Sequence, residues 1–264
     1  MRRASHPARL VLFAYGVLTL VVLYLPLLAV GFASVSKARY LSFPLKRYTM
    51  QWMDEALTSP NVHQLVMTSL KIAVSVTIIS TVFGFFGALA FARFQWRLRG
   101  LFQKAILLPI FFPQTVLGLA LLIWFSTIGV TPSWKTAVVA HLVWLTPITT
   151  LIIAIRAYGF DPALEEAARD MGASTWTTLR EVTLPLLMPG IVTAGLFAFL
   201  LSWGNFPLSL FTTGVDATLP KWLYSRMVSG FTPQIPALGV LSVVGSALLV
   251  GIGLLIMRWM HRRG

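Results

Sequence analysis

Five of the eight acidic residues in this chain lie within one short segment, residues 161–185. They are Asp161, Glu165, Glu166, Asp170 and Glu181. Carboxylates this close together can act as acids and bases, or they can form ion pairs with a partner. The apolar runs and short loops contain no nucleophile–base pair and no His/Asp/Glu cluster, which argues against an enzyme. Because only Arg169 and Arg180 accompany the carboxylates, we expect a charged surface that is presented to another molecule.

A second set of polar residues interrupts the long apolar runs. It comprises Ser202, Trp203 and Asn205 in one run and Gln114 in another. Polar groups inside a membrane-crossing segment are costly, so these residues are candidates for lining a substrate pathway. The alternative is that they bond neighbouring helices, at about 0.6 kcal/mol each. We expect His141 to be a helix contact rather than a proton relay, because no Asp or Glu lies inside any run.

Prolines and glycines beside these polar residues predict irregular helices. Pro109 and Pro113 should kink the run that contains Gln114 and free carbonyl groups there. Gly204 and Pro207 should loosen the run that contains Asn205.

The elements that position these residues are predicted to be transmembrane helices. The chain has 57% hydrophobic and 11% charged residues, whereas soluble chains average about 25% charged. Six apolar runs reach the roughly 20 residues that a helix needs to cross a bilayer. We place the spans at about 10–32, 66–92, 105–130, 136–156, 187–210 and 236–257. The prediction is a single all-α, polytopic domain over residues 1–264, because a β-barrel would show short alternating segments instead.

The basic residues predict the orientation of the spans. The net charge of +13 follows membrane topology rather than nucleic-acid binding, since Lys and Arg concentrate in segments on one side. With both termini cytoplasmic, the segment 93–104 and the tail 258–263 agree with this rule, whereas 37–47 does not. The first run exceeds the usual length of a signal peptide, although cleavage near Ala33 stays open. The chain has no cysteine, which excludes disulfides and thiolate metal sites.

The acidic segment, within a loop over 157–186, is predicted to form two short helices. Asp161 and Pro162 provide a helix start, and Gly172 is placed to end that helix in a left-handed conformation. Ser174 can cap a second helix, which Pro185 and Pro189 should interrupt before the fifth span. The apolar face of the first helix would be Leu164, Ala167, Ala168 and Met171. From the pattern alone, this loop either docks on a partner or packs under its own bundle.

The same loop resembles that of a known family. Glu166-Ala167-Ala168 is followed after three residues by Gly172, and after nine more by Val182-Thr183-Leu184-Pro185. This spacing resembles the EAA loop of ABC importer permeases of the type I, binding-protein-dependent family, with Val182 where isoleucine is usual. The segments 48–52, 68–72 and 211–238 are similar to the second permease of spermidine/putrescine-type systems.

The resemblance implies a type I importer permease fold and a non-catalytic subunit in a bacterial inner membrane. Separate cytoplasmic ATPase subunits would use ATP, which agrees with the lack of a Walker-type glycine loop here. The chain itself would need no cofactor or metal. A second permease, expected to be a different chain rather than a copy, and an extracytoplasmic solute-binding protein would complete the transporter. By carry-over, the ATPase-coupling residues are Glu165, Glu166, Ala167, Ala168, Asp170, Gly172, Leu184 and Pro185.

The substrate is less well defined than the family. Related polyamine permeases tend to carry an acidic residue near Asn205, and this chain has none in its spans. A polyamine or another small organic solute is expected, with neutral, zwitterionic and anionic compounds left open. A secondary transporter or channel is the alternative function, but it would need ion-coupling residues at the membrane midplane.

Overall fold

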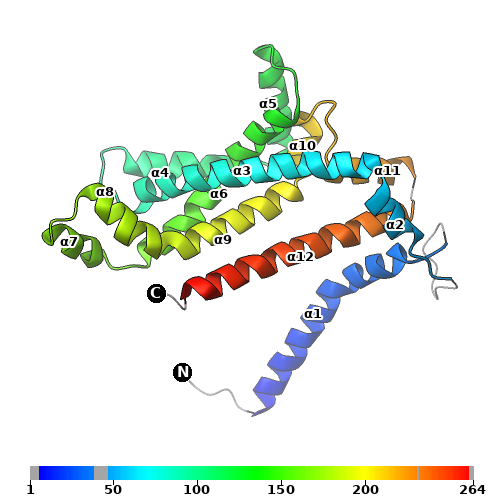
Figure 1. Ribbon diagram of the computed structural model, residues 1–264, viewed down its shortest axis with the longest axis horizontal. Coiled ribbons are helices and arrows are strands. Elements are labelled where there is room, and N and C mark those ends of the chain that lie inside the picture. Colours follow the sequence, from blue (N-terminus) through cyan, green and yellow to red (C-terminus); the bar gives the residue numbers. More distant parts are fainter. Residues whose placement is uncertain (1–5, 39–46, 231, 262–264) are drawn as a thin grey trace. The chain divides into compact units, whose positions relative to one another are not determined.

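The computed structural model describes residues 6–38, 47–230 and 232–261, and this part of the chain is helical (Figure 1). Its only extended pairing within the described residues is an isolated antiparallel bridge between Ser36 and Tyr48. Most of segment 37–47 and the terminal Arg2, Arg3, Arg262 and Arg263 lie outside the described residues. The elements are α1 (His6–Ser34), α2 (Gln51–Thr58), α3 (Pro60–Ala92), α4 (Arg99–Leu107), the 3-10 helix η1 (Leu108–Phe111), α5 (Gln114–Thr127), α6 (Trp134–Tyr158), α7 (Ala163–Asp170), α8 (Thr175–Thr178), the π-helix η2 (Leu179–Thr183), α9 (Leu184–Trp203), α10 (Pro207–Thr212), α11 (Leu219–Ser229) and α12 (Gln234–His261).

The lengths of these helices confirm the predicted polytopic, all-α architecture. Among the described residues, five segments are long and apolar enough to cross a membrane. They are Arg9–Ser34, Pro60–Ala92, Trp134–Tyr158, Thr175–Trp203 and Gln234–Arg258. A sixth candidate is a bent pair, Arg99–Phe111 with Gln114–Thr127, whose two parts meet at 101°.

The chain divides into two compact units, one of residues 1–63 and 223–245 and the other of residues 64–222 and 246–264. In the first unit, α1 is exposed along its apolar length. The Trp52 indole donates a hydrogen bond to the Ser36 carbonyl at 2.9 Å and thereby ties α2 to the segment after α1. All of the candidate site residues belong to the second unit.

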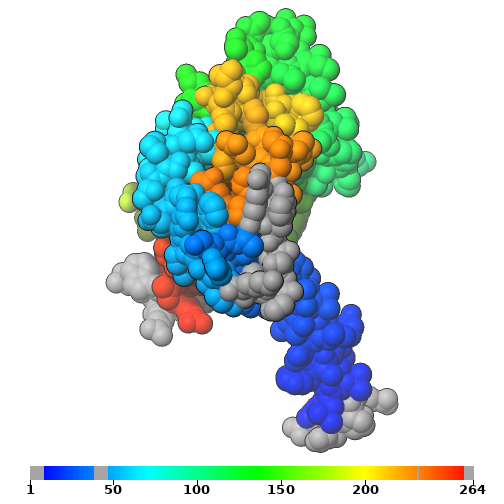
Figure 2. Space-filling view, turned by 90° about the vertical axis from the view of Figure 1, so that its right-hand side faces the viewer, coloured from blue at the N-terminus to red at the C-terminus, as the bar shows by residue number. Residues whose placement is uncertain are grey.

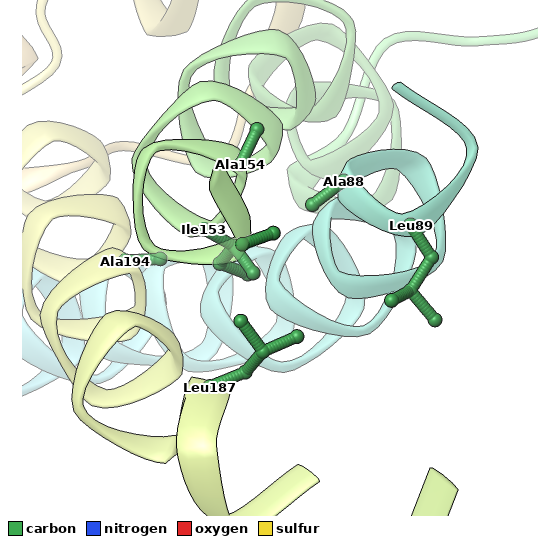
Figure 3. Close-up of a cluster of buried hydrophobic side chains, with 7 residues drawn as sticks. Ala88, Leu89, Ile153, Ala154, Leu187 and Ala194 are labelled. Carbon is green, nitrogen blue, oxygen red and sulfur yellow. The ribbon is translucent and has the colours of Figure 1, made fainter. Parts of the chain in front are cut away.

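The second unit is built on α3, α6 and α9, which pack side by side (Figure 3). Their contact buries a cluster of small and branched side chains. The cluster consists of Ala88, Leu89, Ile153, Ala154, Ala157, Leu187 and Ala194. Because alanines occupy so many of these positions, the helix backbones can approach closely, as is common between membrane helices.

Glycine permits a still closer approach of α3 and α6. A Cβ atom at Gly84 would lie 2.5 Å from Thr149 Oγ1, and one at Gly87 would lie 2.8 Å from Thr150 Oγ1. The Thr149 hydroxyl also donates a hydrogen bond to the Ser80 carbonyl of α3 at 2.7 Å. These contacts leave no room for a larger side chain at Gly84 without moving a helix or a buried hydroxyl.

Two of the predicted spans are broken rather than continuous. The span expected over 105–130 consists of α4, η1 and α5, with its sharp bend at Phe112 and Pro113, so the predicted kink is confirmed. The span expected over 187–210 ends at Trp203, and a separate short helix, α10, follows. The physical reason is the same in both, since Pro113 and Pro207 lack the backbone donor that would continue the helix.

The prolines at the start of α9 do not act as predicted. Pro185 was expected to interrupt the helix together with Pro189, but α9 begins at Leu184 and continues through Pro189. Pro185 is the second residue after the π-helix η2, and a local π turn can re-satisfy the backbone groups that a proline frees inside a membrane helix. Proline is also tolerated inside membrane helices that pack against neighbours. The second helix of the loop therefore joins the fifth span without a break, through α8 and η2.

Gly84→Ala is expected to lower the unfolding temperature of the chain in detergent, at a cost of about 1–3 kcal/mol, because the added methyl group overpacks the α3–α6 contact. Thermal unfolding followed by intrinsic fluorescence measures this change. Gly251→Ala in α12 is the matched control, since no atom lies within 4 Å of its new Cβ atom. It should leave the temperature unchanged or slightly raised, because alanine favours helices. Equal temperatures for the two variants would contradict the close approach.

Candidate functional sites: the acidic loop and a polar helix junction

The acidic loop is organised by local hydrogen bonds of the kind predicted. Asp161 Oδ1 accepts a hydrogen bond from the Ala163 N–H at 3.0 Å, at the start of α7. Gly172 follows α7 with a φ of +87°, in the left-handed region where a side chain causes strain. Ser174 Oγ then accepts from the Thr177 N–H at 3.1 Å and caps α8. The predicted starts of two helices and the glycine between them are therefore confirmed, but only the first helix is short, because the second continues through η2 into α9.

The outer surface of the loop combines apolar and acidic side chains. Leu164 is 48% exposed, Met171 84% and Trp176 70%, which is unusual for large apolar residues of a folded element. The side chains of Glu166, Ala167 and Asp170 are exposed beside them. Ala168, by contrast, is buried. The predicted apolar face is thus divided, with one member turned inward and three turned outward.

The inner side of the loop is held by Glu165. Its Oε2 atom lies 3.0 Å from Arg93 Nη2, and its Oε1 atom accepts a hydrogen bond from Thr183 Oγ1 at 2.6 Å. The Arg93 guanidinium also lies over the Phe160 ring, 3.9 Å from its centroid. Glu165 therefore faces inward, whereas the neighbouring Glu166 faces outward. The positions of Leu184 and Pro185, in the first turn of α9, connect this inner contact directly to a membrane-crossing helix.

Sequence reasoning missed Arg93 and Thr183. Arg93 was counted only as one of the basic residues that set orientation, since it follows an apolar run. Arg93 pairs with Glu165, which lies 72 positions later in the sequence. The two residues belong to different parts of the fold, since Arg93 follows α3 and Glu165 lies in α7. No local pattern reports such a contact. The one signal in the sequence that could have drawn attention to Arg93 is its position directly after an apolar run, which the structure shows to be the end of α3.

The second candidate site lies where the two broken helices meet. Asn205 Nδ2 donates to Gln114 Oε1 at 3.1 Å, and Asn205 Oδ1 accepts from the Leu208 N–H at 3.0 Å. The structure thus brings together two polar residues that were predicted separately. Gly118 of α5 permits this, since a Cβ atom there would lie 3.3 Å from the Pro207 carbonyl. Figure 2 shows α5 (green) beside the yellow and orange segment that contains α10 and the loop after it.

Of the other two predicted pathway residues, Ser202 belongs to an adjoining buried network and Trp203 is half-buried beside it. His141 is fully buried, with Nδ1 2.9 Å from Ser202 Oγ and Nε2 3.1 Å from Ser209 Oγ. The histidine thus joins α6 to both α9 and α10, as expected for a helix contact. Trp203 stacks on Phe199, with ring centroids 6.2 Å apart. These contacts match the helix-packing alternative, and the pathway role stays a prediction.

The far end of α6 is fastened to the loop after α10. The Trp134 N–H donates to Asp216 Oδ2 at 2.8 Å, and Thr136 Oγ1 donates to the Thr212 carbonyl at 2.7 Å. Lys221 Nζ donates to the Gly214 carbonyl at 2.7 Å. Partial burial lowers the pKa of Lys221, and the nearby Asp216 carboxylate opposes this shift. With 25 residues, α6 is roughly 37 Å long, so this loop and the acidic loop lie at opposite ends of the second unit.

The described residues contain no group of three or more His, Cys, Asp or Glu side chains that could hold a metal ion. The arrangement instead offers a charged, partly apolar surface at one end and a buried amide–hydroxyl network further along the bundle. The buried network does place two serine hydroxyls beside a histidine, Ser202 and Ser209 on His141, and all three of these side chains are buried between helices.

Known proteins are similar to this chain in sequence. Residues 80–263 match the family described as the inner membrane component of binding-protein-dependent transport systems. The spermidine/putrescine transport system permease protein PotC of Haemophilus influenzae is 30% identical over 237 residues, which cover 89% of this chain and 92% of that protein. The molybdenum transport system permease protein ModB of Escherichia coli is 31% identical, covering 78% of this chain and 96% of its own.

Solved structures agree on the fold. A chain of a bacterial alginate ABC transporter, in complex with a periplasmic protein that carries an alginate pentasaccharide, superposes with a TM-score of 0.68 at 16% identity, covering 93% of this chain and 92% of that one. A chain of the MetNI methionine ABC transporter gives a TM-score of 0.62 at 21% identity, covering 77% and 99%. The chain therefore belongs to the family of inner membrane components of binding-protein-dependent transport systems, the permease subunits of ABC importers.

Proposed function

We propose that this chain converts ATP-driven closure of separate ATPase subunits into movement of a solute pathway. The observation that carries the proposal is the acidic loop, which exposes Leu164, Met171 and Trp176 while its Glu165 side chain contacts Arg93 and Thr183 at the membrane helices. An exposed patch of large apolar side chains with carboxylates at its rim suits a protein partner. A loop of this kind can both receive a force and pass it on.

The proposal places the acidic loop in the cytoplasm and the chain in a bacterial inner membrane. The concentration of basic residues around 93–104 supports this orientation. A second permease and an extracytoplasmic binding protein complete the assembly, and the family description, which names an inner membrane component that depends on a binding protein, supports both the location and the latter partner. Resemblance to PotC favours a different chain, rather than a second copy, as the partner permease.

The substrate is proposed to be a small solute that the pathway recognises through amide and hydroxyl groups. Asn205 and Gln114 at the helix junction are the proposed pathway residues, with Ser202 and Trp203 beside them. Relatives are named for spermidine, putrescine and molybdenum transport, so the family accommodates both cationic and other cargoes. Because no carboxylate lies in the spans, we favour a neutral, zwitterionic or anionic solute over a polyamine.

The purified chain alone is expected to hydrolyse no ATP, since the nucleotide sites belong to its partners and no Walker-type glycine loop occurs in the sequence. Phosphate release from the detergent-solubilised chain, with and without co-expressed ATPase subunits, measures this. Hydrolysis should appear only with the ATPase subunits present. Sustained hydrolysis by the chain alone would overturn the proposed role.

Gly172→Val is expected to reduce ATP-dependent uptake at least about tenfold, because a β-branched residue at a φ of +87° is strained by roughly 1–3 kcal/mol and should distort the turn between α7 and α8. The measurement is solute uptake by proteoliposomes that contain the complete importer. Gly100→Val is the matched control, since Gly100 lies in helix α4 with nothing within 4 Å of the new Cβ atom. Equal uptake by the two variants would remove the acidic loop from coupling.

Asn205→Asp tests the pathway without destroying the helix junction. A carboxylate can still accept from the Leu208 N–H, and the amide of Gln114 can rotate to donate to it. The variant should keep both hydrogen bonds at a stability cost of up to about 3 kcal/mol for a charge inside a span, and it should disfavour anionic solutes and favour cationic ones, because the new negative charge would lie at the proposed pathway. Competition of a panel of charged and neutral solutes against uptake measures the shift. If a variant that still folds and inserts shows the selectivity of the wild type, the role of Asn205 is purely structural.

A further inference from the structure

The Glu165 carboxylate joins the chain on either side of the acidic loop. One oxygen pairs with Arg93, the first residue after α3, and the other accepts a hydrogen bond from Thr183, the last residue before α9. Each oxygen has its own partner, at 3.0 Å and 2.6 Å respectively. A single side chain of α7 is thus fastened to the end of α3 and to the turn that leads into α9.

This contact is shielded from solvent. The side chains of Arg93 and Glu165 are 11% and 14% exposed, and Phe160 covers one face of the guanidinium. Arg169 also approaches Glu165, but at 4.0 Å and with 55% of its side chain exposed. Because buried pairs are screened far less than exposed ones, the Arg93 pair dominates this contact. Arg169 cannot replace Arg93, since it belongs to α7 itself and ties the loop to nothing else.

The helices that receive this contact pack against one another at the same end. Ala88 and Leu89, in the last turns of α3, pack with Leu187 of α9 and with Ile153 of α6 (Figure 3). A push on the outer face of α7 therefore reaches a packed three-helix core through Glu165. Densely packed interiors transmit strain rather than absorb it.

The chain connection alone provides a weaker link. Between α8 and α9 the backbone forms a five-residue π-helix, Leu179–Thr183. Such wide turns are rare and are found mostly at functional sites. Without a side-chain tie, this turn can tighten to α-helical geometry and let the loop move while α9 stays in place. The Glu165 contact spans this turn and prevents that slippage.

We propose that Arg93 and Glu165 form a brace that positions the acidic loop, so that displacement of α7 is passed to α3 and α9. Both residues act as positioning residues and neither contacts the ATPase subunits. The inference rests on the proposed function of the loop. It assigns the two adjacent glutamates different tasks, with Glu166 on the docking surface and Glu165 in transmission.

The test uses the complete importer in proteoliposomes, with three measurements on each preparation: co-purification of the ATPase subunits, ATP hydrolysis and solute uptake. The double variant R93M/E165Q cuts the tie to α3 while removing both charges, so no unpaired charge is left buried. Glutamine keeps an acceptor for Thr183, and methionine keeps the packing on Phe160. We expect normal co-purification and hydrolysis but uptake reduced by about tenfold, within the usual range of coupling effects. The ATP consumed per solute imported should rise by the same factor.

Two further variants test whether the loss of uptake comes specifically from the Arg93–Glu165 pair. Arg169→Gln removes the exposed arginine at 4.0 Å and should leave all three measurements unchanged. Arg93→Lys keeps the charge but loses the planar group that lies on Phe160, so it should recover part of the uptake lost in the double variant. Partial rescue by lysine distinguishes a charge-dependent brace from general damage to the fold.

Other outcomes overturn the inference. Wild-type ratios of uptake to hydrolysis in R93M/E165Q would show that the brace is not needed. Loss of co-purification in that variant, with hydrolysis and uptake falling together, would place Glu165 on the docking surface instead. Failure of the wild-type chain to bind ATPase subunits at all would refute the proposed function itself, and it is recognisable because it appears before any substitution is made.

Discussion

A membrane interior offers no water to an unpaired N–H or C=O group, so a helix that breaks there needs partners from the protein. In this chain two breaks lie together, and a side chain supplies the partner of a backbone N–H at one of them. Pro113 and Pro207 each end a run of helical hydrogen bonds, and the side chains beside them, Gln114 and Asn205, bond across the gap. The Asn205 side chain also accepts a hydrogen bond from the Leu208 N–H, which has no partner within the helix. Irregular backbone is thereby collected at one buried junction, which leaves α5 and α9 regular on either side of it.

Helix α6 links this junction to both ends of the second unit. Its first turn is fastened to the loop after α10 through Asp216, its middle holds the break through His141, and its last turns lie in the apolar core with α3 and α9. The Thr149–Ser80 hydrogen bond adds a polar tie along the way. Because one continuous helix carries all of these contacts, events at the acidic loop and at the helix junction share a common rigid element.

The features that the sequence predicted are those that depend on neighbours in the chain. Asp161, Gly172 and Ser174 act within three residues of themselves, so the starts of the loop's two helices and the glycine between them could be predicted in detail. The apolar runs predicted the helices, and the prolines predicted the bend after Phe112. The pairing of Asn205 with Gln114 could not be predicted, because 91 residues separate them. The prediction for Pro185 was wrong for a different reason. A proline need not end a helix when the turn before it widens to π geometry, as η2 does here, and the sequence does not show that widening.

The difference between Glu165 and Glu166 is one that the sequence pattern around them does not predict. One step along a helix turns a side chain by about 100°, which is enough to carry Glu165 under the loop and to leave Glu166 on its surface. The two residues are chemically identical, and both are stabilised near the start of α7. What separates them is the end of α3, which places a guanidinium on one side only. The function of a charged loop in such a protein therefore depends less on its own composition than on which membrane helix ends beneath it.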